Sequence, residues 1–139
     1  MRDTSENING WTLKRIYEMS GKGEFVKDFS HKDQVNRSAG SIMDNIAEGF
    51  ERGGKKELIQ FLFISKGSSG EARSQLDRAF DKKYLTSQEL ESSKDKVLTI
   101  GKQLSGFIHY LKTSELKGSK YVHEPGESYS IVEGINFEF

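Results

Sequence analysis

Cysteine is absent from the 139-residue chain. Without it the chain has no disulfide framework and no thiolate metal site. Proline is almost absent as well, because the one proline, Pro125, lies near the C-terminal end. The long stretch before it contains no residue of this helix-breaking type, which favours long, uninterrupted helices.

An excess of charge of either sign is also missing. The chain has 21 basic and 21 acidic residues, so its formal net charge is zero. A strong nucleic-acid binder usually has a basic excess. The balanced total does not exclude a local basic patch. No apolar run approaches the roughly 18 residues of a membrane-spanning helix, and the first ten residues, MRDTSENING, do not resemble a signal peptide. We therefore expect a cytoplasmic protein without a membrane partner.

Histidine is scarce, which weighs against metal and acid–base chemistry. A di-iron four-helix bundle needs two Glu-x-x-His pairs, and none of His31, His109 and His123 has a glutamate three positions earlier. Asp28 precedes His31 by three residues, but we expect Ser30 to cap a helix and leave this pair outside it. No nucleophile motif, P-loop or dinucleotide fingerprint occurs. We therefore predict no metal, no cofactor, no catalytic residue and no enzymatic activity.

Apolar residues recur at three- and four-residue steps along four segments, as in amphipathic helices. The expected helices cover residues 9–20, a segment from the Ser30 cap to the Gly53–Gly54 turn, residues 55–81, and residues 86–112. The links are short, which makes neighbouring helices antiparallel. We predict an all-α, antiparallel up-down-up-down four-helix bundle over residues 1–112. Residues 113–139 should form a non-helical C-terminal tail, extended or weakly β, with disorder as the alternative.

Two capping boxes support these helix starts. Thr86 and Glu89 have the required spacing, and Leu85 and Leu90 flank them as a hydrophobic staple. In the second expected helix, Ser30 and Asp33 have the same spacing, with aspartate in place of glutamate. Along the third expected helix, we expect a line of core-facing residues that ends in Phe80.

A polar stripe runs along the second expected helix, and on a helical wheel it lies largely opposite the apolar side. It comprises Gln34, Arg37, Ser41, Asn45, Glu48 and Arg52. It could be a solvated face, with Glu48 and Arg52 as an i,i+4 ion pair. It could instead be a contact surface that a neighbouring subunit or ligand covers, or a small catalytic site built on Glu48 or Asn45. We favour the contact surface and rank catalysis last.

The third expected helix is apolar on more than one side. Leu58 and Leu62 face the core, whereas Ile59 and Phe63 lie roughly 100° around the helix axis. A helix of this kind is buried on more than one side, and the simplest partner is a second copy of the chain. The glycines of the small-residue patch that follows would allow another helix to approach closely. The predicted subunit interface comprises Ile59, Phe63, Ile64, Gly67 and Gly70. As alternatives, Phe63 packs under the tail or is simply exposed.

Lysines gather in small clusters near the helix ends. We consider Lys55, Lys56, Lys82 and Lys83 as weak nucleic-acid contacts, because several copies in an oligomer would multiply them. The alternative is ordinary solubilising charge.

The run DQVNRSAGSIMDNIAEGFERGGKKELIQFLFISKGSSGEARSQL, followed by YLTSQEL, resembles the 23S rRNA intervening-sequence proteins, also described as ribosomal-protein-like. Their signature is roughly D-Q-x-x-R-A-A-x-S-I-x-x-N-I-A-E-G, a glycine-rich turn, and F-L-x-I-A-x-G-S-x-x-E. Its first part is matched by Asp33, Gln34, Arg37, Ser41, Ile42, Asn45, Ile46, Ala47, Glu48 and Gly49. Its second part is matched by Phe61, Leu62, Ile64, Gly67, Ser68 and Glu71.

This resemblance implies a four-helix protomer, assembly as a homopentamer, and an association with rRNA or a ribonucleoprotein. It supplies no catalytic residues. Some members of the family are accessory proteins to retroelement reverse transcriptases, so a nucleic-acid-binding accessory protein is the alternative function. The balanced charge of this chain departs from those strongly basic relatives. The short distance from Trp11 to Ile16 also departs from the longer first helix of the family.

Overall fold

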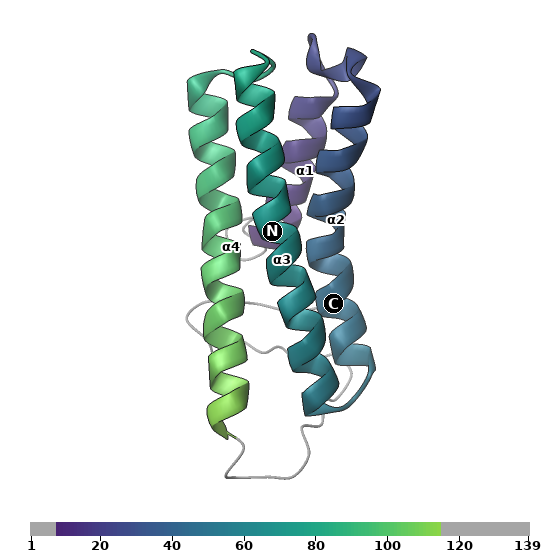
Figure 1. The fold of residues 1–139 in the computed structure, drawn as a ribbon, viewed down its shortest axis with the longest axis vertical. Coiled ribbons are helices and arrows are strands. Elements are labelled where there is room, and N and C mark those ends of the chain that lie inside the picture. The colour runs from purple at the N-terminus through teal and green to yellow at the C-terminus, as the bar shows by residue number, and fades with distance from the viewer. Residues whose placement is uncertain (1–7, 115–139) are drawn as a thin grey trace, which may run out of the picture.

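The computed structural model describes residues 8–114 of the chain. Its four α-helices are α1 (Ile8–Ser20), α2 (Phe29–Glu51), α3 (Lys55–Asp81) and α4 (Ser87–Thr113), and a short 3-10 turn, η2 (Phe25–Lys27), precedes α2. The helices lie side by side with alternating directions (Figure 1). This part of the chain contains no strand. The predicted all-α four-helix fold is therefore confirmed, while the predicted tail beyond Ser114 lies outside the described residues.

The first helix is about half as long as the longest ones. It has 13 residues, whereas α3 and α4 have 27 each. At 1.5 Å per residue, α1 extends about 20 Å along a bundle whose longest helices extend about 40 Å. It packs against α2 and α4 at the end of the bundle that contains η2 (Figure 1). Among the described elements, the opposite end is built from α2, α3 and α4 alone.

The apolar core has two parts that correspond to these two ends. Ile16, Met19 and Phe25 pack with residues of the other helices around the α1 end. Phe50 and Phe107 belong to the cluster at the opposite end. The predicted core line of α3 is buried as far as Leu76, but Phe80, expected to continue it, is 38% exposed. That expectation is wrong because the core position of this last turn is taken by Ala79, which is fully buried, and Phe80 is turned about 100° away from it.

The α2–α3 hairpin depends on two glycines. Gly53 has a φ of +76°, a left-handed conformation that side chains with a Cβ rarely adopt, and it turns the chain between the helices. A Cβ on Gly49 would lie 3.0 Å from both the Cβ of Phe61 and the Cδ1 of Leu58. Gly49 therefore allows α2 and α3 to approach closely beside the turn.

One of the two predicted capping boxes forms. The hydroxyl of Thr86 accepts a hydrogen bond from the backbone N–H of Glu89 (3.0 Å), and the Glu89 carboxylate accepts one from the N–H of Thr86 (2.9 Å). The prediction that Ser30 caps the second helix is wrong. Helix α2 begins two residues earlier, at Phe29, and Asp28 caps it by accepting from the N–H of His31 (3.1 Å). His31 therefore lies inside α2, and the expectation that it lies outside a helix is wrong for the same reason.

Candidate interaction surface

The polar stripe of α2 lies along its seam with α3. Ser41 and Asn45 are half-buried there rather than opposite the packed side, as the helical wheel suggested. The hydroxyls of Ser41 and Ser68 are 2.8 Å apart, and Asn45 donates to both the hydroxyl and the carbonyl of Ser41 (2.8 Å each). Farther along the seam, Arg78 donates to the side-chain oxygen of Gln34 (3.0 Å). The helical wheel misplaced the stripe because α3 packs against the flank of α2 as well as against its apolar side.

The remaining stripe residues also have partners within the protomer. Arg37 pairs with Asp33 (3.5 Å), and Arg52 pairs with Glu48 (2.9 Å). The Arg52 guanidinium also lies over the ring of Phe61, 5.2 Å from its centroid. Glu48 is the stripe residue with acid–base chemistry, and its carboxylate is exposed and ion-paired. Within the protomer, the stripe is therefore a polar seam with α3 together with exposed ion pairs, and its side chains have partners there.

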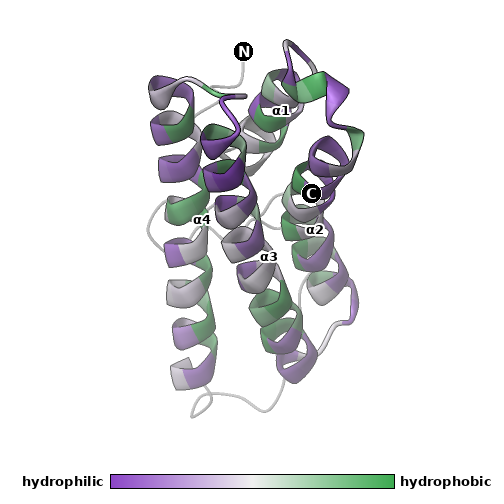
Figure 2. Cartoon of the chain, turned by 45° about the horizontal axis from the view of Figure 1, so that its top comes forward, coloured by the Kyte–Doolittle hydropathy of each residue, from purple (hydrophilic) through white to green (hydrophobic). Residues whose placement is uncertain are grey.

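The outer face of α3 carries two adjacent, exposed apolar side chains. Phe63 is 45% exposed and Ile64 is 47% exposed. The N-terminal half of α3 is hydrophobic on the side that faces the viewer in Figure 2. Lys112 of α4 reaches over one edge of this face, with its ammonium 4.9 Å from the Phe63 ring centroid. Gly67 and Gly70 follow Phe63 and Ile64 along the same helix.

The five predicted interface residues do not all lie on that outer face. Ile59 is partly buried against the protomer core, whereas Phe63, Ile64 and Gly67 are exposed and Gly70 is half-buried. A Cβ placed on Gly67 or Gly70 would meet nothing within 4 Å. Packing inside the protomer therefore does not require either glycine. The alternative in which the tail covers Phe63 concerns residues outside the described range.

The four lysines considered as nucleic-acid contacts are not brought together. Lys55 and Lys56 begin α3, whereas Lys82 and Lys83 follow its last residue. The two pairs are thus about 40 Å apart along the helix axis. Lys82 is further engaged by Asp28, with its ammonium 3.0 Å from the carboxylate. These residues form no single patch within a protomer.

Asp28 is the centre of a polar cluster that joins α2 to the end of α3. Its carboxylate accepts from Lys82 and from the hydroxyl of Tyr84 (2.8 Å). The bonds from Lys82, Tyr84 and the His31 N–H lower the pKa of Asp28 from 3.8 to about 2, and the bond to Asp28 raises the pKa of Tyr84. His31 Nε2 lies 2.8 Å from the carbonyl of Gln75, which only accepts, so Nε2 carries the proton and Nδ1 accepts from Lys82 (3.2 Å).

The bonds of this cluster join the start of α2 to the residues that follow α3. In the part of the chain that the structure describes, no group of three or more His, Asp or Glu side chains is placed to hold a metal ion. None of the described helices is both long and apolar enough to cross a membrane.

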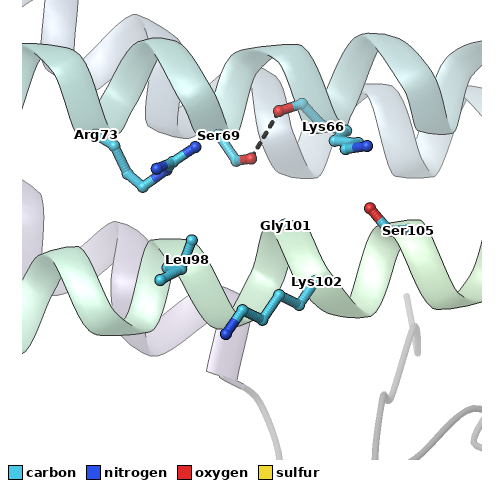
Figure 3. A pocket seen from close by; sticks show the side chains of 7 residues that line it. All are labelled: Lys66, Ser69, Arg73, Leu98, Gly101, Lys102 and Ser105. Carbon is cyan, nitrogen blue, oxygen red and sulfur yellow. Dashed lines mark hydrogen bonds between the residues drawn. The ribbon is translucent and has the colours of Figure 1, made fainter.

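A basic pocket between α3 and α4 was not predicted from the sequence. Its volume is about 180 Å³, and seven residues line it: Lys66, Ser69, Arg73, Leu98, Gly101, Lys102 and Ser105 (Figure 3). The sequence carries little signal for it, because two of its cations are on one helix and the third is on the next. Only the packing of α3 against α4 places them around one hollow.

Comparison with known proteins agrees with the resemblance predicted from the motif residues. The family described as 23S rRNA-intervening sequence protein matches residues 12–106. A solved structure from Bacteroides thetaiotaomicron, described as a protein with unknown function from the S23 ribosomal protein family, has a similar fold. Its TM-score is 0.67 at 24% sequence identity, covering 75% of this chain and 97% of that chain. No curated protein matches the chain.

Proposed function

Because the chain belongs to the family of 23S rRNA-intervening sequence proteins, we propose that it is a non-enzymatic interaction protein that assembles with copies of itself. The observation that carries the proposal is the outer face of α3. There Phe63 and Ile64 each leave nearly half of a large apolar side chain exposed. The family resemblance suggests five copies, and it suggests rRNA or a ribonucleoprotein as the external partner.

The energetics favour a broad contact that includes this face. Fully burying a large apolar side chain contributes roughly 1.5–3 kcal/mol, so covering the exposed parts of Phe63 and Ile64 contributes about half of that each. This is too little alone to offset the entropy that association costs. The neighbouring polar seam would supply the surrounding rim, since interfaces combine an apolar centre with polar margins.

The open glycines give this face a shape that suits another helix. A glycine inside a helix costs up to about 1 kcal/mol relative to alanine. The protomer gains no packing from Gly67 or Gly70 in return. Close approach by a neighbouring subunit would compensate for that cost. In a closed ring each subunit contributes two different surfaces, and we assign the outer face of α3 to one of them.

Light scattering during gel filtration tests the proposal. We expect the unaltered protein to elute at a multiple of its 15.8 kDa chain mass, near five chains. Phe63→Asp and Ile64→Asp should each lower that mass while far-UV circular dichroism stays helical. Gly67→Leu should do the same, because its side chain would project into open space in the protomer but block a partner. Phe29→Asp is the matched control, since Phe29 is 78% exposed at the start of α2.

The outcome is decisive in either direction. A monomeric unaltered protein would contradict the proposal. So would an unchanged mass in all three α3 variants, or dissociation by Phe29→Asp alone.

The alternative function, a nucleic-acid-binding accessory protein of a reverse transcriptase, gains no support from the relatives of this chain. Neither the matching family nor the solved relative from Bacteroides thetaiotaomicron is described as acting with such an enzyme.

A further inference from the structure

We infer that the pocket between α3 and α4 binds a phosphoryl group, either as free phosphate or as a phosphate of RNA. Lys66 and Arg73 of α3 and Lys102 of α4 line it, and none of its lining residues is acidic. The pocket lies within one protomer, so this inference does not rest on self-association.

Small residues create the hollow. Ser69 of α3 faces Gly101 of α4 so closely that a Cβ on Gly101 would lie 3.1 Å from the Ser69 hydroxyl. Figure 3 shows the hydroxyl of Ser105 pointing into the space between the helices from the α4 side. The volume of about 180 Å³ is below the roughly 300–1,000 Å³ of pockets for drug-sized ligands. The space therefore suits a small polyatomic anion.

The cations around the hollow have no acidic partner among the described residues. The ion pairs of this part of the chain do not include Lys66, Arg73 or Lys102. The nearest acidic residue along α3 toward the C-terminus of the helix, Asp77, already pairs with Lys94 at 2.9 Å. Figure 3 shows the Lys102 side chain running along α4 with its ammonium directed away from α3; because Lys66 and Lys102 are both exposed, their flexible side chains can turn toward an anion in the hollow. The pocket therefore has uncompensated positive charge.

Arg73 also has a hydrogen-bond donor without an acceptor. Its Nε is buried and has no hydrogen-bond partner within the described structure. A buried donor without a partner is destabilising, and more so when it belongs to a charged group. Arginine donates from a planar fork that matches phosphate oxygens. A phosphoryl group in the hollow would accept from Arg73, neutralise part of the lysine charge and present oxygens to both helices.

Calorimetric titration of the full-length protein with inorganic phosphate, in a phosphate-free buffer of low ionic strength, tests this inference. We expect saturable binding with one site per chain. Arg73→Gln and Lys102→Gln should each weaken it about tenfold, as expected for a lost charge-assisted hydrogen bond. Lys14→Gln is the matched control and should bind as the unaltered protein does, because Lys14 is exposed on α1 and does not line the pocket. Circular dichroism and mass confirm that each variant is folded.

A competition arm separates the two sources of phosphate. A single-stranded RNA oligonucleotide without terminal phosphates is added to the phosphate-bound protein. Displacement of phosphate, with RNA affinity reduced in Arg73→Gln but not in Lys14→Gln, identifies the RNA backbone as the ligand. Phosphate binding without competition identifies a free phosphoryl ligand.

A thermal measurement gives an independent readout. A ligand that binds only the folded state raises the melting temperature, so the same phosphate concentration should raise it more for the unaltered protein than for Arg73→Gln. The inference is overturned if neither phosphate nor RNA binds saturably, or if Arg73→Gln and Lys102→Gln both bind like the unaltered protein.

Discussion

The two sides of α3 differ in how their polar groups are satisfied. Toward α2, the hydroxyls and amides of Ser41, Asn45 and Ser68 bond to one another across the seam. Toward α4, Arg73 is left with a buried donor that has no partner among the described residues. Ser41, Asn45 and Ser68 are thus satisfied within one protomer, whereas Arg73 can still donate to a ligand. Gln75 of α3 also keeps a buried side-chain oxygen without a partner among the described residues, but Arg73 differs from it because its unpartnered donor belongs to a charged group.

The difference between the two sides should be largest at the two glycines where the helices approach. Gly49→Ala should destabilise the protein by about 1–3 kcal/mol, because its Cβ would meet the Phe61 Cβ and Leu58, which cannot move away without repacking. Gly101→Ala should stay within about 1 kcal/mol of the unaltered stability, because its Cβ would meet only the Ser69 hydroxyl, at 3.1 Å, which a small shift relieves, and because alanine favours the helix. Urea unfolding at one protein concentration measures both. Equal losses for the two variants would contradict this distinction.

A pair of serines tests the same difference with a smaller effect. Ser41→Ala should cost about 1 kcal/mol, because it removes the hydroxyl that Asn45 and Ser68 share. Ser105→Ala should change stability by less than about 0.5 kcal/mol, because this half-buried residue of the pocket has no hydrogen-bond partner for its hydroxyl within the described residues. The same unfolding curves provide the measurement. A larger loss for Ser105→Ala than for Ser41→Ala would show that the pocket side, not the seam, depends on its hydroxyl.

The smallest expected effect is the pH dependence of the cluster that joins α2 to the end of α3. The pKa of Asp28 is about 2 in the folded protein and ordinarily 3.8. Its ionised form therefore stabilises the fold fully above pH 3.8, and this contribution is lost as the pH falls toward 2. Asp28→Asn should flatten the dependence of the melting temperature on pH in this window. Lys83→Gln is the control, and a profile of Asp28→Asn that parallels the unaltered one would contradict the assignment.

Local patterns predicted the helices well, because the determinants lie within a few residues of each other. The Thr86–Glu89 capping box is one example, since both of its hydrogen bonds join residues three apart. The position of Phe63 and Ile64 away from the core line is another, because helical spacing alone decides it. The start of α2 was mispredicted although its cap bond also joins residues three apart, because Asp28 and Ser30 are both residue types that cap helices and local sequence does not choose between them. Asp28 is held by Lys82 and Tyr84, which are more than fifty residues away in sequence.

Periodicity and short-range capping were enough to specify four amphipathic helices, their order and the surplus of apolar surface on the third, and the motif residues indicated the family. None of these features depends on which helix packs against which. The partners of the polar groups, in contrast, followed from the packing: Ser41 meets Ser68 across one seam, while Lys66, Arg73 and Lys102 surround a hollow at the other. Hydrogen bonds and charge compensation act over a few ångströms, and those distances are set only when the helices come together.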